Sequence, residues 1–118
     1  MSIVLIVEDE MNLALMAEDL LVLAGYSVIK ASRVTNALKL VDDHRVDAAL
    51  LDVNINGTYV FPVALKLRQL DVPFVFVTGY GAEGIPEMYQ DCPIMTKPYD
   101  GQRLLREVAK LLASDGAC

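Results

Sequence analysis

The sequence predicts an α/β protein with a doubly wound, five-stranded parallel sheet in the order 2-1-3-4-5. The apolar residues switch repeatedly between a strand-like and a helix-like period, and the strand-like runs are apolar on both faces. The chain has 118 residues, the size of one domain. Alternating strands and helices require right-handed crossovers, which place helices on both faces of a parallel sheet. Ligands of such sheets bind beyond the carboxyl ends of strands one and three.

Short apolar runs bounded by turn residues give the predicted strands, and apolar residues three and four apart give the helices. The predicted strands are Ser2–Val7, Tyr26–Lys30, Asp47–Val53, Val72–Thr78 and Pro93–Thr96. The predicted helices are Asn12–Ala24, stopped by Gly25; Val34–Val41, ending near His44; Val60–Leu70; and a closing helix capped by Asp100 with apolar residues from Leu104 to Leu112.

The fourth crossover is the least regular part of the chain. Gly81, Gly84 and Pro86 interrupt residues 80–90 and leave room for one or two helical turns beginning near Pro86. The fourth helix is therefore expected to be short or irregular.

Charge and composition exclude several classes of protein. Ten basic against sixteen acidic residues give a net charge of −6, with no basic cluster beyond Arg103, Arg106 and Lys110, so direct nucleic-acid binding is not expected. The longest apolar runs have five residues, too few for a membrane span. Cys92 and Cys118 suggest neither a disulfide framework nor a zinc site. We expect a single cytoplasmic domain over residues 1–118.

Complementary side chains follow the predicted strands at their carboxyl ends. Glu8-Asp9-Glu10 follows the first strand, Asp52 ends the third, Thr78 the fourth, and Lys97-Pro98 follows the fifth. Neighbouring strands lie about 4.8 Å apart, so these groups are expected to converge. Clustered carboxylates favour a hard cation, and Mg²⁺ suits a shallow site held by one or two of them. The backbone carbonyl of Asn54 could supply another oxygen.

This arrangement predicts phosphoryl chemistry at Asp52. A metal would neutralise an incoming phosphoryl group and leave the Asp52 carboxylate free to attack it, while Thr78 and Lys97 hold the transferred oxygens. Each residue also has a purely structural interpretation: the acidic run could stabilise a helix N-terminus, and the others could be turn or surface residues. Their joint position at one edge of the sheet favours the functional interpretation.

The whole chain resembles a bacterial response-regulator receiver domain, which is CheY-like with a flavodoxin-like fold. The resemblance rests on Glu8-Asp9, on Asp52 in LLDVNING, on Thr78-Gly79 and on Lys97-Pro98. It implies that Asp52 is the phospho-acceptor and that Glu8 and Asp9 place Mg²⁺. It also implies that Thr78 and Lys97 contact the phosphoryl group and that the bond before Pro98 is cis.

Residues 73–80, PFVFVTGY, narrow the resemblance to the FAT GUY subgroup, with Val77 where that signature has Ala. Most receivers carry an aromatic switch residue where this chain has Ile94, so the usual coupling between Thr78 and a ring is in question. Tyr80 could take part in the switch or be a surface aromatic, and both interpretations stay open. The subgroup implies a histidine kinase of the HWE or a related type and a role in stress response.

The resulting hypothesis is a stand-alone response regulator without an output domain. It would accept a phosphoryl group from a histidine kinase and signal through the surface formed by helix four, strand five and helix five, and it would not be a turnover enzyme. Three alternatives remain: a phosphate sink or relay intermediate, a degenerate receiver that binds without phosphorylation, and a phosphohydrolase. The last lacks the second aspartate that haloacid-dehalogenase-like enzymes carry two residues after their nucleophile.

Overall fold

A parallel sheet organises the fold, and the computed structural model describes residues 2–114. Its strands run in the order β2-β1-β3-β6-β7, which is the predicted order 2-1-3-4-5 once a separate two-stranded hairpin is set aside. The prediction of a doubly wound sheet is therefore confirmed. The strands are β1 (Ile3–Val7), β2 (Ser27–Ala31), β3 (Ala48–Asp52), β6 (Phe74–Thr78) and β7 (Ile94–Thr96).

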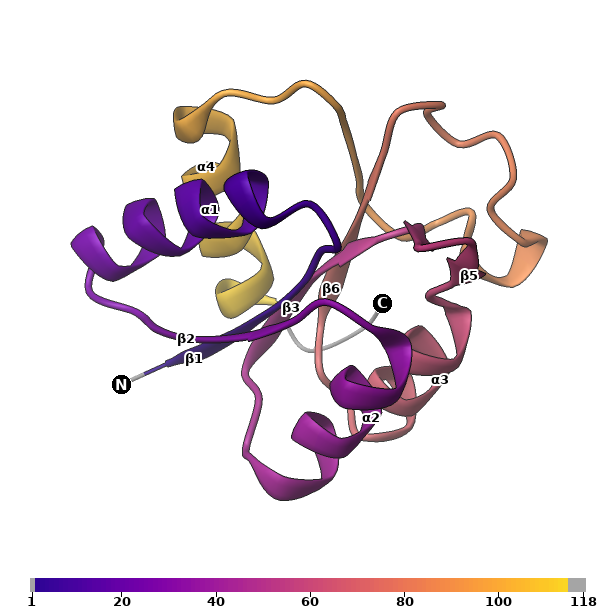
Figure 1. The fold of residues 1–118 in the computed structure, drawn as a ribbon, viewed down its shortest axis with the longest axis horizontal. Coiled ribbons are helices and arrows are strands. Elements are labelled where there is room, and N and C mark those ends of the chain that lie inside the picture. The colour runs from indigo at the N-terminus through magenta and orange to yellow at the C-terminus, as the bar shows by residue number, and fades with distance from the viewer. Residues whose placement is uncertain (1, 115–118) are drawn as a thin grey trace.

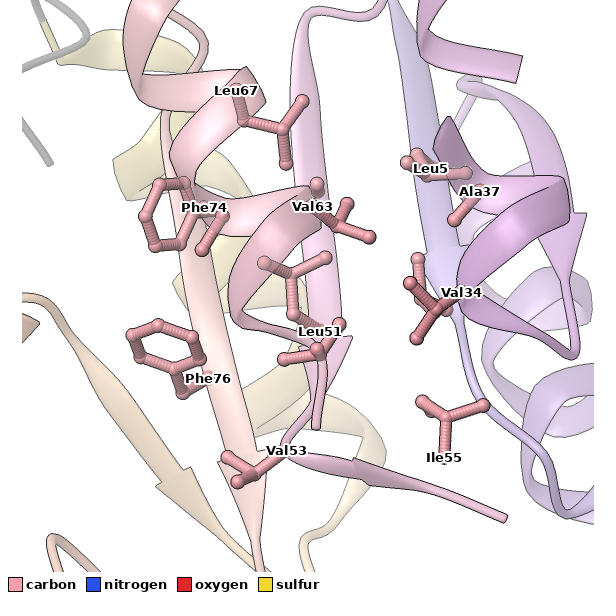
Figure 2. Packing of buried hydrophobic residues seen from close by; sticks show 14 of the residues in the cluster. Leu5, Val34, Ala37, Leu51, Val53, Ile55, Val63, Leu67, Phe74 and Phe76 are labelled. Atoms are coloured by element: carbon pink, nitrogen blue, oxygen red, sulfur yellow. The ribbon is translucent and has the colours of Figure 1, made fainter. Parts of the chain in front are cut away.

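Two layers of helices cover the sheet (Figure 1), with α1 (Met11–Leu23) and α4 (Gly101–Ala113) on one face and α2 (Val34–Asp43) and α3 (Phe61–Gln69) on the other. Successive side chains of a strand point to opposite faces. Leu5, Leu51 and Phe76 accordingly pack beneath α2 and α3 (Figure 2). Their neighbours Val4, Leu50 and Val75 pack beneath α1 and α4. Both cores are fully formed, which explains why the strands are apolar on both faces.

The helix ends follow local chemistry, with one departure from expectation. Asp100 caps α4 as predicted, because its Oδ1 accepts a hydrogen bond from the Arg103 N–H at 2.8 Å. The cap of α1 is Glu10, whose carboxylate accepts from the N–H groups of Asn12 and Leu13 at 3.1 and 3.0 Å. Glutamate is not among the preferred N-cap residues, so residue type alone did not mark Glu10 as the cap.

A β-hairpin follows β3, between the predicted strand that ends at Val53 and the predicted helix that begins at Val60. Strands β4 (Asn54–Ile55) and β5 (Thr58–Tyr59) pair antiparallel around Asn56 and Gly57. Both turn residues have positive φ, 52° and 84°. Asn-Gly favours such a turn, because both residues tolerate left-handed backbone and its twist matches that of the flanking strands. Asn56 and Gly57 therefore form a turn between paired strands, and Asn54 lies on β4.

The connection between β6 and β7 holds a single short 3₁₀ turn, η1 (Glu87–Tyr89), entered through Pro86. This agrees with the prediction of a short or irregular fourth helix. Arg68 at the end of α3 holds the segment in place. Its guanidinium donates to the Met88 carbonyl at 2.9 Å and to Cys92 Sγ at 3.2 Å, and it lies 4.7 Å from the centre of the Tyr89 ring. Contacts from α3 therefore fix a segment with little secondary structure of its own.

Two expectations from composition have different outcomes. Among residues 2–114, no helix combines the length and the apolar character that a membrane span requires. The two cysteines suggested no disulfide framework, whereas Cys92 is disulfide-bonded. The spacing of cysteines identifies metal sites, but it carries no information on which distant residue a thiol approaches. Cys118, the second cysteine of that expectation, lies outside the described residues.

Candidate functional site

The carboxyl ends of β1, β3 and β7 bring a cation and two carboxylates into direct contact. Glu8 follows β1, Asp52 ends β3 and Lys97 follows β7. Lys97 Nζ lies 2.8 Å from Asp52 Oδ2 and 2.9 Å from Glu8 Oε1. The side chain of Lys97 reaches across β6 to do so, since β6 lies between β3 and β7. The predicted convergence of these residues is therefore present in the structure.

The acidic run after β1 divides between the site and the helix. Glu8 is buried and also accepts a hydrogen bond from the Glu10 N–H at 3.1 Å, while Glu10 itself caps α1. Asp9 contacts the hairpin turn, because its Oδ2 accepts from the Asn56 N–H at 2.9 Å. The functional and structural interpretations of this run thus apply to different residues, and the hairpin turn is tied to the acidic cluster through Asp9.

Burial and the shared cation set the charge state of the site. Burial, together with a hydrogen bond to Asp52, raises the pKa of Glu8 to about 7 despite the opposing contact with Lys97. Burial also acts to lower the pKa of Lys97, but its hydrogen bonds to Asp52 and Glu8 outweigh that effect, and the pKa of Lys97 is raised above its usual value. Lys97 therefore remains charged while Glu8 titrates near neutrality.

The pKa of Glu8 predicts a pH dependence of stability. In the folded protein this carboxyl keeps its proton between its usual pKa of 4.5 and about 7, so its contribution is full below 4.5 and is lost as the pH rises through 7. Relative to Glu8→Gln, the wild-type protein is expected to lose on the order of 3 kcal/mol of unfolding free energy across that window. Denaturant unfolding of both proteins with a chelator measures this difference, and parallel pH profiles would contradict it.

The carboxylates of Glu8, Asp9 and Asp52 also fit a divalent cation. One oxygen from each lies within 4.8 Å of the others, so a single ion could contact all three. An all-oxygen donor set with several like charges suits Mg²⁺. Asn54, the other predicted ligand, lies beside this cluster at the start of the hairpin. Its side-chain Oδ1 accepts from the Gly57 N–H at 2.8 Å, so the backbone carbonyl remains the oxygen it would offer.

The remaining predicted residues occupy two different places. Thr78 is buried at the end of β6, and its Oγ1 accepts from the Tyr80 N–H at 3.0 Å. Thr78 and the exposed Tyr80 line the same hollow as Asp52. Ile94 lies apart from it, partly buried against the core beneath α2 and α3. The peptide bond between Lys97 and Pro98 is cis.

One residue of this hollow, which the hairpin contributes, was not predicted from the sequence. Tyr59 on β5 lines the same hollow beside Asp52 and Thr78. The Asn56-Gly57 pair was the available signal, because a turn of that type between short apolar runs predicts a hairpin that folds back on the preceding strand.

Comparisons with known proteins agree on one family. The family model of the response regulator receiver domain matches residues 4–109. The solution structure of SdrG from Sphingomonas melonis Fr1 is 37% identical, with a TM-score of 0.82, and the match covers 95% of this chain and 97% of that one. The response regulator TrrA from Thermotoga maritima, solved in complex with Mg²⁺ and BeF, is 25% identical with a TM-score of 0.83, over 95% of this chain and all of that one (100%).

Curated relatives give the same result over only part of their own length. The uncharacterized transcriptional regulatory protein YrkP of Bacillus subtilis is 31% identical over 115 residues, which are 92% of this chain and 48% of that protein. The regulatory protein VanR of Enterococcus faecium and the probable transcriptional regulator ycf27 of Cyanidium caldarium are matched over 35% and 30% of their length. The chain therefore spans about half or less of the length of these three relatives. The family match, the sheet order and the acidic edge lead to one conclusion: the chain belongs to the receiver domain family of two-component response regulators.

Proposed function

We propose that Asp52 accepts a phosphoryl group from a partner histidine kinase and that the resulting acyl phosphate switches protein–protein interactions. One observation carries this proposal: Lys97 Nζ lies 2.8 Å from Asp52 and 2.9 Å from Glu8, with Asp9 beside them. A nucleophilic carboxylate, a fixed cation and a divalent-cation site thus occupy one edge of the sheet.

The side chains of the chain itself divide the chemistry between them. A carboxylate oxygen of Asp52 attacks phosphorus, and the bond from phosphorus to the donor breaks with its electron pair leaving on the donor atom. Lys97 already contacts Asp52 and holds its positive charge against the oxygens of the incoming group. Thr78 accepts from the Tyr80 N–H, which leaves its own hydroxyl proton to donate to a phosphoryl oxygen.

Mg²⁺ is the proposed metal, held by Glu8, Asp9 and Asp52 with the carbonyl of Asn54. When bound, it supplies positive charge that offsets repulsion between the carboxylates and the phosphoryl oxygens. The complex of the related TrrA with Mg²⁺ and BeF supports this choice. Glu8 loses its proton as the pH rises through about 7, so a cation is expected to bind more tightly above that pH.

The proposed partners follow from the FAT GUY resemblance in residues 73–80. The donor is a histidine kinase, of the HWE or a related type, and the proposed setting is cytoplasmic stress signalling. Ile94 is aliphatic and packs against the core, which supports a switch built on Thr78 and Tyr80. The proposed output surface consists of η1, β7 and α4. Phosphoryl acceptance without turnover of a substrate makes the protein a signalling component rather than an enzyme.

We also propose that the protein acts as a single-domain regulator. The chain covers 92% of Sporulation initiation phosphotransferase F of Bacillus subtilis and 95% of the polar-differentiation response regulator DivK of Brucella anthropi, at 25% identity to each. An immunoblot of the native protein tests this directly, because an attached output domain would give a much larger species.

The central test is covalent labelling of Asp52. Incubation with acetyl phosphate or phosphoramidate and Mg²⁺ is expected to raise the intact mass by one phosphoryl group. Asp52→Asn is expected to abolish the adduct because an amide is not a carboxylate nucleophile. Asp91→Asn, which changes an exposed carboxylate, is the matched control and is expected to label like the wild type. An unmodified wild-type mass, or labelling of Asp52→Asn, would overturn the proposal.

A further inference from the structure

The disulfide-bonded Cys92 lies where the connection between β6 and β7 returns to the sheet. Cys92 is 5% exposed and belongs to the core beneath α2 and α3. Its N–H donates to the Tyr89 carbonyl at 3.0 Å. The carbonyl of the next residue, Pro93, accepts from the Phe76 N–H on β6 at 3.0 Å. A chemical change at this sulfur therefore acts directly on the backbone that joins η1 to β7.

The sulfur of Cys92 lies against the guanidinium of Arg68. Arg68 Nη2 donates to Cys92 Sγ at 3.2 Å, and the same guanidinium contacts the Met88 carbonyl and the ring of Tyr89. Within residues 2–114 the ion pairs are all made by other side chains, so no carboxylate neutralises this half-buried cation. A disulfide sulfur is a neutral, weak acceptor, whereas a thiolate is an anion. Arg68 therefore stabilises the reduced sulfur more than the disulfide.

The proposed cytoplasmic setting bears on what such a disulfide does. Thiol pools reduce most disulfides in the cytoplasm, and those that form there are mainly transient or redox-sensing. Cys118 is the one other cysteine in the sequence, so a disulfide within this chain requires it. A cation that stabilises the reduced sulfur works against a permanent structural bond, but it suits a bond that opens and closes.

We propose that the disulfide at Cys92 is a reversible redox switch, which a thiol reductant of the glutathione class opens and which Arg68 biases toward the reduced state. Because Cys92 is buried, the reductant thiolate attacks the partner sulfur. The S–S bond breaks, and its electron pair goes to Cys92 Sγ, which leaves as a thiolate beside Arg68. A second reductant thiolate resolves the mixed disulfide and releases the partner thiolate, which takes up a proton. The protein gains two electrons, and the two reductant thiols become one disulfide.

Equilibration in glutathione redox buffers without denaturant tests this proposal, with acid quenching, alkylation and intact mass as the count of thiols. The wild-type protein is expected to gain two alkylated thiols as the buffer becomes more reducing, and to lose both when oxidised glutathione is restored. Arg68→Gln keeps hydrogen-bond donors without the charge and is expected to lower the equilibrium constant for reduction about tenfold. Arg68→Lys keeps the charge without the planar fork and is expected to lower it no more than about threefold. Arg106→Gln, at an exposed position on α4, is the matched control and is expected to behave like the wild type.

The sign of the Arg68→Gln effect separates a redox role of Arg68 from a structural one. If Arg68 only held the segment in place, its loss would lower the effective concentration of the two thiols and make the disulfide easier to reduce. A disulfide that is harder to reduce in Arg68→Gln supports the proposal. An unchanged or easier reduction overturns it, as does a wild-type disulfide that opens only after unfolding. The measurement does not involve Asp52, so its failure leaves the proposed function intact.

Discussion

Lys97→Met is expected to lower the unfolding free energy of the metal-free protein by about 3 kcal/mol at a pH above 7. Methionine keeps the apolar stem but removes the charge that lies 2.8 Å from Asp52 and 2.9 Å from Glu8. The lysine side chain is only 24% exposed, so water screens the remaining carboxylates poorly. Below the Glu8 pKa of about 7 the loss is expected to shrink, because Glu8 then takes up a proton.

A second lysine provides a matched control for this prediction. Lys30 Nζ also lies 2.8 Å from a carboxylate, that of Glu18, but the two side chains are 36% and 27% exposed. Lys30→Met is therefore expected to cost less than about 1 kcal/mol. Denaturant unfolding with a chelator measures both variants. Equal losses would show that removing Lys97 costs no more than breaking an exposed ion pair. Recovery of stability in the double variant Asp52→Asn/Lys97→Met would show that the unpaired charge of Asp52 causes the loss.

Phe76→Ala is expected to destabilise the protein by about 4 kcal/mol, the range found when a large aromatic residue is removed from a core. Phe76 is fully buried on β6 beside Phe74 (Figure 2). The centre of its ring lies 5.2, 5.9 and 5.6 Å from the ring centres of Phe74, Phe61 and Tyr89. Truncation leaves a cavity beneath the face covered by α3 and removes a ring from this cluster, so the loss combines lost burial with lost contacts.

The same measurement on an exposed residue calibrates this effect. Leu65 lies on the outer side of α3 with 44% of its side chain exposed, and Leu65→Ala is expected to change stability by no more than about 0.5 kcal/mol. Because Tyr89 also belongs to the segment between β6 and β7, Phe76→Ala is further expected to make that segment more susceptible to limited proteolysis. A loss below about 1 kcal/mol would mean that the ring cluster repacks around the gap.

The sequence predicted the sheet and the position of the site because both depend on short-range patterns. A strand covered on both faces has to be apolar throughout, as Val4 to Val7 are, and parallel strands place their carboxyl ends at one edge. Glu8, Asp52 and Lys97 each lie at the carboxyl end of a parallel strand, so their meeting is a consequence of topology. The split of the acidic run between a site and the Glu10 cap depends on backbone geometry that residue type does not encode.

Long-range contacts account for what the sequence analysis missed. The hairpin had a local signal in Asn56-Gly57, but the stacking of Tyr59 on Phe61 depends on how β5 returns over the start of α3. The path of residues 79–93 depends on Arg68, which is distant in sequence. No periodicity marks an arginine as a structural anchor, because the same residue at the end of a helix usually faces solvent.

The contacts of Arg68 bear on which residues between β6 and β7 can vary in sequence. The segment after β6 is held by the burial of Tyr89 and by one guanidinium that contacts the Met88 carbonyl, Cys92 and the ring of Tyr89. One of these contacts is to backbone, which every residue type provides, so position 88 itself is free to vary. We expect the exposed residues around position 88 to tolerate substitutions and insertions, provided that an arginine on α3 and an aromatic ring at position 89 are both kept.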